Sequence, residues 1–425
     1  MRALSTTVSL LVLLAGCTPK AEDIERWKGT QKGPGKLKEA AASASLSDEL
    51  RGQAVAALFE IGDAQGALDG LAKQDKTKQA ATVHAALTIL EKQLGEEGPK
   101  GLGAKDALFS LRDAASQADR TKIDTLLVAW LCKDLAGRLG QGGHSGEKIL
   151  VAAGPIAAAA LVPLAQPASP QLALVTALLG KLPDAAARTQ VVDRLIAAAQ
   201  RFGTGEIPQP LIVAIAQTGG PRAGEFLIEV AESPRKDSRA NALVALISAP
   251  ADTRNDKVLA GCARIALDKK APGKAREAAF NVAEKVGPSA VGTLVKLIDQ
   301  PEETLRWRAV EAAFVAGGEA AIGPSLRALP AGAKYKLEDL DSYVVHDVRK
   351  VGDKAVPALA AILTDATASP VTKIAALRAL GAVGKAADAP KAKALVGDTK
   401  PLANFVPPTS IGKEAEAAAA SLAKR

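Results

Sequence analysis

The stretch DELRGQAVAALFEIGD, residues 48–63, decides the fold of this chain. Its alanine, valine and leucine residues recur three and four positions apart, the spacing that gives a helix one apolar face. An arginine stands near its start, and a glycine followed by an aspartate ends it, as expected where a helix passes into a turn. The segment therefore predicts an amphipathic helix that stops at Gly62.

The same pattern returns at four later places, 275–287, 305–318, 345–353 and 371–384. The turns at Gly287, Gly318, Gly352 and Gly384 follow one another at steps of 31, 34 and 32 residues. A repeated helix–turn–helix unit of this length is typical of a solenoid, in which each unit buries its apolar face only against its neighbours. We predict an all-α fold, an α-solenoid of about ten helix pairs over residues 47–409, closed by a capping helix at 410–425.

The ends of several helices have a predicted local cause. Ser169-Pro170, Ser233-Pro234 and Ser369-Pro370 each place a side-chain oxygen before a proline, an arrangement expected at the first residues of a helix.

Three segments resemble HEAT-like repeats, particularly the bacterial kind that shares its pattern with bilin lyases. They are LRGQAVAALFEIGDAQGALDGLAK (50–73), VRKVGDKAVPALAAIL (348–363) and ALRALGAVGKAADAPKAKAL (376–395). The resemblance implies an arginine early in the first helix of a repeat, at Arg51, Arg239, Arg276, Arg306 and Arg378, and a turn aspartate at Asp63 and Asp353. It covers roughly residues 48–400 and says little about activity, because function is not carried by a fold alone.

The N-terminus has the layout of an export signal. One positive charge, Arg2, precedes the apolar run Val8–Leu14, and polar residues follow from Thr18. A helix needs about 20 apolar residues to span a membrane, so this run is too short to do so.

The end of that run, Leu14-Ala15-Gly16-Cys17, resembles the lipobox of bacterial lipoproteins. The resemblance implies cleavage between Gly16 and Cys17, removal of residues 1–16, and acylation of Cys17, with palmitate among the expected chains. Thr18 stands where an aspartate would favour the inner membrane, so the outer membrane is favoured, with the solenoid in the periplasm. The alternative is an ordinary cleaved signal.

Residues 17–46 are polar, rich in lysine, and interrupted by Gly33-Pro34-Gly35. We predict that the lipidated cysteine begins a flexible tether over this range, which holds the folded part away from the bilayer.

The sequence predicts no metal site and no cofactor. His84, His144 and His346 have no ligand-type residue at metal-binding spacing on a shared helix face. The loop 142–148 lacks the Gly-Lys-Ser/Thr order of a phosphate loop. Cys132 and Cys262 lie in apolar helical patterns, so they are expected to be core thiols and not a disulfide.

Basic residues are densest between positions 235 and 276. A possible partner-binding region comprises Lys236, Arg239, Lys269, Lys270 and Lys274. The alternative is a set of solvated helix ends, where cations also complement the helix dipole.

The chain is basic, with 54 Lys and Arg against 46 Asp and Glu and a formal net charge of +8. An exported chain does not meet nucleic acid, so the expected partners are the lipid bilayer and an envelope protein with an acidic face. We therefore predict a non-catalytic protein-binding scaffold in the cell envelope. The alternative is a lyase-like or other enzyme built on the HEAT-like repeats.

Overall fold

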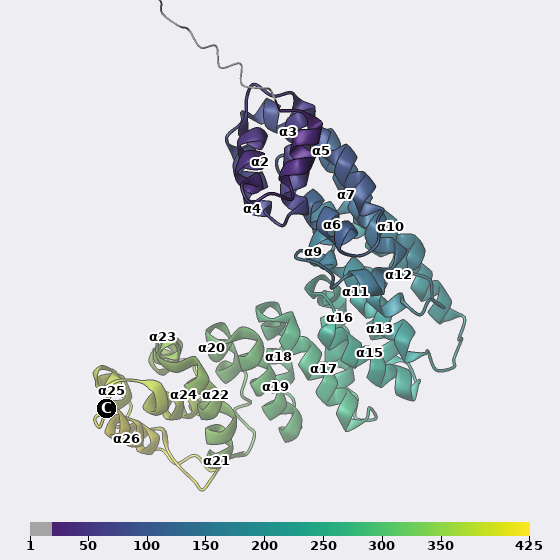
Figure 1. Cartoon of the computed structure of the whole chain (residues 1–425). Coiled ribbons are helices and arrows are strands. Elements are labelled where there is room, and N and C mark those ends of the chain that lie inside the picture. Colours follow the sequence, from purple (N-terminus) through teal and green to yellow (C-terminus); the bar gives the residue numbers. More distant parts are fainter. Residues whose placement is uncertain (1–18) are drawn as a thin grey trace, which may run out of the picture. The chain divides into compact units, whose positions relative to one another are not determined.

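The computed structural model describes residues 19–425, so Gly16 and Cys17 lie outside the described residues. The chain divides into two compact units, Met1–Pro163 and Leu164–Arg425 (Figure 1).

The described part of the first unit is built from ten helices. They are α1 (Ala21–Trp27), α2 (Gly33–Ala42), α3 (Asp48–Glu60), α4 (Ala64–Ala72), α5 (Lys76–Leu94), α6 (Pro99–Leu111), α7 (Gln117–Lys133), α8 (Leu135–Arg138), α9 (Gly146–Ala153) and α10 (Pro155–Leu161). Consecutive helices pack as pairs, and α3, α5 and α7 also pack against one another in chain order, which is how a repeat stack buries its core.

The second unit continues the pattern with α11 (Leu172–Lys181), α12 (Ala185–Gln200), α13 (Gln209–Thr218), α14 (Pro221–Glu232), α15 (Lys236–Ser248), α16 (Asp256–Leu267), α17 (Gly273–Val286), α18 (Val291–Ile298), α19 (Glu303–Gly317) and α20 (Glu319–Arg327). It ends with α21 (Leu337–Asp339), the π-helix η4 (Leu340–Val345), α22 (His346–Val351), α23 (Val356–Thr364), α24 (Pro370–Val383), α25 (Ala389–Lys393) and α26 (Ile411–Leu422). Short 3-10 turns η1 (Val162–Leu164), η2 (Ala251–Thr253), η3 (Pro288–Ala290), η5 (Gly352–Ala355) and η6 (Ala386–Asp388) join them.

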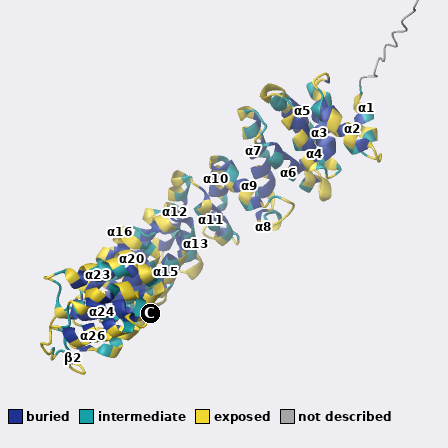
Figure 2. Cartoon of the chain, turned by 90° about the vertical axis from the view of Figure 1, so that its left-hand side faces the viewer, coloured by how far each residue is buried: buried dark blue, intermediate teal, exposed yellow. Residues whose placement is uncertain are grey.

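Helices of the second unit form two layers. In one layer α11, α13, α15, α17 and α19 pack in order, and η4, α22, α24 and α26 extend it. In the other, α12, α14, α16, α18, α20, α23 and α25 follow in the same way. Alanine, leucine, valine and isoleucine fill the space between the layers, while exposed residues cover the outside (Figure 2). The fold is the predicted all-α solenoid of helix pairs.

One small pair of strands interrupts the helices. The strand β1 (Tyr335–Lys336) pairs in parallel with β2 (Phe405–Val406), and Tyr335 and Phe405 are almost completely buried. After β2 the chain enters α26, which packs on α24 and α25 at the position where the sequence predicts a final helix.

The prediction of a flexible tether over residues 17–46 is wrong for residues 21–42. These residues form α1 and α2, and both helices pack against α3. Ile24 and Leu37 are completely buried. The Gly33-Pro34-Gly35 cluster does not break a helix but begins one, because proline is tolerated in the first turn, where its missing N–H has no partner to lose.

A test of this correction is the Leu37→Ala substitution. Removing a buried leucine side chain should destabilise α2 and its packing on α3 by about 2–4 kcal/mol. Native-state hydrogen exchange should show protected amides in α2 that lose most of their protection in the variant. Glu39→Ala, an exposed position on the same helix, is the matched control and should leave exchange unchanged. If the α2 amides of the wild-type chain exchanged as fast as those of an unfolded peptide, the prediction of a flexible tether would be correct after all.

The predicted serine caps are confirmed at one place and wrong at two. Ser369 accepts a hydrogen bond from the Thr372 N–H and Pro370 opens α24. The helices after Ser169 and Ser233 begin instead at Leu172 and Lys236.

In the described part of the chain no single helix has the length and apolar character to cross a membrane. One sharply bent pair of helices, Gly146–Ala153 with Pro155–Leu164, meets the length and composition criteria when the two are taken together.

Candidate binding surface

Arginines recur at one position of the repeat. Arg51, Arg120, Arg239, Arg276 and Arg306 are each the fourth residue of a helix, in α3, α7, α15, α17 and α19. At this place a long side chain can reach back across the first turn to the loop that precedes its helix.

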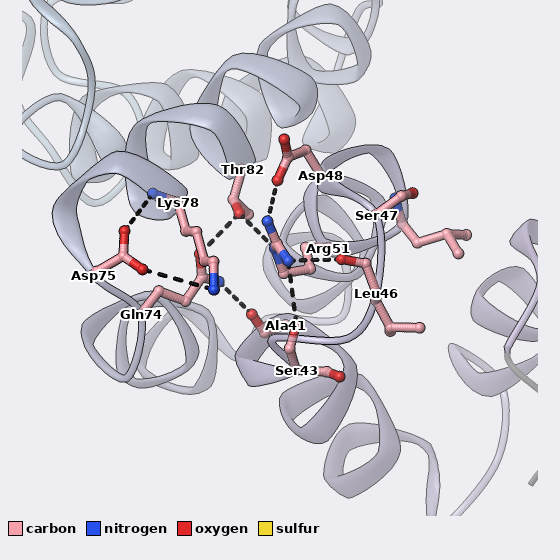
Figure 3. Close-up of polar contacts among 11 residues, drawn as sticks. Ala41, Ser43, Leu46, Ser47, Asp48, Arg51, Gln74, Asp75, Lys78 and Thr82 are labelled. Atoms are coloured by element: carbon pink, nitrogen blue, oxygen red, sulfur yellow. Dashed lines mark hydrogen bonds and ion pairs between the residues drawn. The ribbon is translucent and has the colours of Figure 1, made fainter.

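The Arg51 side chain shows how this position works (Figure 3). It is 3% exposed, its Nη1 donates to the backbone carbonyl oxygen of Leu46 at 2.6 Å, and its Nε donates to Thr82 Oγ1 at 3.0 Å. Its Nη2 also pairs with Asp48. The Thr82 hydroxyl in turn donates to Gln74 Oε1 at 2.9 Å. One guanidinium therefore ties the loop before α3 to the first turns of α5.

Arg239 and Arg276 do the same with different partners. Arg239 donates twice to the carbonyl oxygen of Ser233, with Nη2 at 2.7 Å and Nε at 3.2 Å. Arg276 donates from Nε to the carbonyl oxygen of Ala266 at 2.8 Å and from Nη2 to Glu302 at 2.9 Å. These donors, filled by neighbouring carbonyl and carboxylate oxygens, tie each helix to the segment before it, and Arg276 also reaches the repeat that follows.

Arg378 does not share this position, contrary to the resemblance. It is the ninth residue of α24, where Nε donates to Asp341 at 2.9 Å and Nη1 to Glu414 at 2.6 Å. It therefore links α24 to η4 on one side and to α26 on the other.

The predicted basic region falls at the N-terminal ends of α15 and α17, two helices that pack against each other. Lys236 opens α15, Lys269 and Lys270 lie in the turn between α16 and α17, and Lys274 is in the first turn of α17. All four lysines are exposed. A small pocket of about 180 Å³ lies nearby in the chain, where α15 contributes Arg239 and the turn after α16 contributes residues 268 and 271. None of the four lysines lines this pocket.

Arg239 differs from these lysines, because it is partly buried and its guanidinium is bonded to Ser233. Its side chain therefore stabilises the loop before α15, and its guanidinium is not available in the way that the lysines are.

The remaining cations of this stretch are already engaged. Arg264 donates to Glu232 at 2.5 and 3.1 Å, and Lys257 pairs with Glu225 at 2.9 Å. No ion pair involves Lys236, Lys269, Lys270 or Lys274 among the described residues. We call these four side chains the lysine edge. Their charges are free to meet an acidic partner.

The loop 142–148 is held by α6. Lys105 is completely buried, and its Nζ donates to the carbonyl oxygen of His144 at 2.7 Å and pairs with Asp106 at 3.0 Å. Asp106 accepts the backbone N–H groups of Gly143 and His144 at 2.7 and 2.9 Å. Burial acts to raise the pKa of Asp106, but these two hydrogen bonds and Lys105 outweigh it and the pKa is lowered. The Lys105–Asp106 pair therefore holds the loop 142–148 in one conformation, which its glycines alone would not do.

Histidines show no shared site. His144 Nε2 lies 3.1 Å from Ser110 Oγ, but that hydroxyl donates to the carbonyl oxygen of Asp106 at 2.8 Å, which does not prepare it as a nucleophile. His84 Nδ1 lies 2.8 Å from Asp119 Oδ1 on the surface of the first unit. No group of three potential metal ligands occurs in residues 19–425.

The two thiols in the described part of the chain are free. Cys262 is buried in α16, and burial raises its pKa to about 12, which keeps it a neutral core thiol at physiological pH.

One polar cluster escaped the sequence reasoning. Arg308 on α19 donates to Glu277, Glu284 and Asn281 on α17, at 2.7, 2.7 and 2.8 Å. The available signal was the spacing, since Glu277 and Arg308 lie about one repeat apart and opposite charges at that spacing face each other across neighbouring helices.

No protein family and no curated protein sequence matches the chain. Two solved structures are similar to it in part. The crystal structure of Kap121p bound to Nup53p is 12% identical, with a TM-score of 0.22, over 94% of this chain and 42% of that chain. The crystal structure of Kap121p is 13% identical, with a TM-score of 0.21 and the same two coverages.

The chain therefore spans less than half the length of the structures it matches. The fold assignment comes from the two layers of paired helices described above.

Proposed function

We propose that the chain is a non-catalytic, protein-binding scaffold of the bacterial cell envelope, fastened to a membrane by lipid on Cys17. The observation that carries the binding role is the lysine edge: four exposed ammonium groups at the N-terminal ends of α15 and α17 that form no ion pair among the described residues, whereas Lys257 and Arg264 in the same stretch are paired. Such a row favours a partner with an acidic face, because complementary potentials speed encounter and fix register.

Support for the anchor comes from the sequence, from the short apolar run and Leu14-Ala15-Gly16-Cys17. A lipid-fastened chain works at a surface, and a solenoid offers an extended face for recruiting another envelope protein. The outer membrane, with the repeats in the periplasm, is the proposed location, since Thr18 is not an aspartate. Cys17→Ser is the variant that tests the anchor.

The lysine edge is tested by the triple substitution Lys269→Glu, Lys270→Glu, Lys274→Glu. Tagged wild-type protein should capture a stoichiometric partner from detergent-solubilised envelopes, and the variant should capture at least about tenfold less at low salt, because each reversal replaces attraction by repulsion. Raising the salt should weaken wild-type capture toward the variant's level.

A matched control changes the same net charge elsewhere on the second unit, through Lys285→Glu, Lys296→Glu and Lys354→Glu, all at exposed positions. Capture by this control should stay near that of wild type. Equal loss in both variants would show that net charge alone matters, and would remove the lysine edge from the proposal. Failure of the wild-type chain to capture any stoichiometric partner would overturn the scaffold itself.

A further inference from the structure

An open pocket of about 470 Å³ lies between the loop that precedes α19 and the loop that precedes β1. Arg306, from the first turn of α19, lines it together with Lys334. Asp299 and Glu303 are its acidic residues. The pocket is part of the second unit and is separate in sequence from the lysine edge.

The guanidinium of Arg306 is buried but poorly partnered. Arg306 is only 3% exposed, and its Nε has no hydrogen-bond partner. Its Nη2 makes two long contacts, 3.4 Å to the carbonyl oxygen of Gln300 and 3.5 Å to that of Pro301. The guanidinium carbon lies 5.4 Å from the centre of the Tyr335 ring. A buried cation with most of its donors unfilled is unfavourable unless an anion completes it.

Two of the equivalent arginines are completed by a carboxylate. Arg276, one repeat earlier, pairs with Glu302, the residue just before α19, and Arg51 pairs with an aspartate of its own helix. The residue in the place of Glu302 one repeat later is Lys336, just before α21. The position that supplies a carboxylate to Arg276 therefore holds a lysine in the next repeat, and no carboxylate from it reaches Arg306.

The wall of the pocket is fixed in place. The Tyr335 hydroxyl donates to the carbonyl oxygen of Pro330 at 2.8 Å, and the Tyr335 N–H donates to that of Asn404 at 2.8 Å. The Asn404 amide in turn donates to the carbonyl oxygens of Ala331 and Ala333, both at 3.2 Å. The loop that carries Lys334 is thus held by the paired strands, and the site is preorganised.

The charges around the pocket select the kind of anion. Lys334 is exposed and has no ion pair among the described residues, so it can add a second contact. Within residues 19–425, neither Asp299 nor Glu303 forms an ion pair with Arg306. These two carboxylates repel a doubly charged phosphate more than a singly charged group, so a carboxylate fits better.

We propose that this pocket binds a carboxylate of a protein partner, held by the Arg306 guanidinium and by Lys334. The inference rests on the proposed scaffold function and names one chemical group that a partner must present. A guanidinium can take a carboxylate through two parallel N–H donors, which gives direction as well as affinity. The source is an acidic side chain or a chain terminus, since both carry the same group.

The test follows the side-chain Nε–Hε signals of arginine by ¹⁵N NMR on the whole chain. The probes are acetyl-Gly-Asp-Gly-amide, which carries only a side-chain carboxylate, acetyl-Gly-Gly-Gly with a free terminal carboxylate, and neutral acetyl-Gly-Asn-Gly-amide. We expect the Arg306 signal, assigned with Arg306→Lys, to move with one or both charged peptides at a dissociation constant on the order of millimolar. The neutral peptide should leave it unmoved.

Two internal controls sharpen the result. The Arg276 signal should not move, because Glu302 already occupies its guanidinium. Lys334→Ala, at an exposed position that should not disturb folding, should weaken binding about threefold. No movement of the Arg306 signal with either charged peptide would overturn the inference, as would movement with inorganic phosphate alone, or equal movement of the Arg276 signal.

The outcome is separable from that of the scaffold proposal. If a captured envelope partner bound wild-type chain and Arg306→Lys equally well, the carboxylate pocket would be wrong as a partner site while the scaffold stood. If the peptides moved the Arg306 signal but no envelope partner was captured, the pocket would stand as a carboxylate site and the scaffold would fail.

Discussion

Arg51→Met is expected to destabilise the region around α3 and α5 by about 3 kcal/mol. Methionine keeps most of the apolar length of the side chain but removes every donor. The carbonyl oxygen of Leu46 then loses its 2.6 Å hydrogen bond, and Thr82 Oγ1, which is completely buried, loses the 3.0 Å bond from Nε. Unfilled buried acceptors account for most of the expected loss, because Asp48 is partly exposed and can be rehydrated.

The measurement is native-state hydrogen exchange of peptides from α3 and α5, which reports local opening without requiring the whole chain to unfold in one step. Arg26→Met is the matched control, because Arg26 is 70% exposed and pairs with Asp23 within α1. A surface pair of this kind contributes about 0–1 kcal/mol, so exchange should change little. An Arg51→Met chain as well protected as wild type would show that the guanidinium does not hold these repeats together.

The repeat itself could be predicted because its signals are local. Gly62 and Gly287, predicted as turn positions, have φ of +83° and +82°, a conformation that favours glycine. The early arginine is placed correctly in α3, α15, α17 and α19, since it is fixed by its distance from the start of each helix. Arg378 was misplaced because α24 begins eight residues earlier, at Pro370.

What the arginines bind could not be predicted, because their partners come from other elements. Glu302 completes Arg276 from the next repeat, whereas Arg306 faces a pocket formed with the loop before β1. That loop is held by Asn404, which lies 71 residues from Ala333 in sequence. The periodic pattern within one repeat carries no information about a contact between residues so far apart in sequence.

The folded N-terminus was missed for the same reason. Its helices are short and contain few apolar residues, so the sequence pattern gives only a weak indication that they form. Ile24 and Leu37 are buried only because α3 supplies the surface against which they pack. The lysines of this region do not distinguish a flexible chain from a helix, because lysine is also a good helix former on an exposed face.

This correction changes what the proposed anchor implies. With α1 beginning at Ala21, only Thr18 to Lys20 separate Cys17 from folded structure. Three residues reach at most about 10 Å when extended. Under the proposal, the first helices lie close to the headgroups, where exposed lysines such as Lys32 and Lys36 can each add about 1 kcal/mol of attraction to anionic lipid.

Cys17→Ser should accordingly release the protein from the membrane. One acyl chain gives only reversible attachment and further chains make it effectively permanent, at about 0.8 kcal/mol for each buried methylene. A hydroxyl accepts no thioether-linked lipid, so the variant keeps at most the electrostatic attraction of its lysines. We expect wild type in the membrane fraction at every salt concentration, and the variant in the soluble fraction once salt screens that attraction.

Fractionation at about 0.15 M and 0.5 M salt, together with the mass of the N-terminal peptide, measures both parts of this expectation. Cys132→Ser makes the same chemical change in α7 and should leave wild-type fractionation intact, because Cys132 lies inside the folded first unit. If the Cys17→Ser chain stayed with the membrane at high salt, or kept the wild-type N-terminal mass, lipid on Cys17 would not be the anchor. Attachment through exposed lysines such as Lys32 and Lys36 alone would instead show a steep loss of binding between the two salt concentrations, whereas deeper insertion would show none.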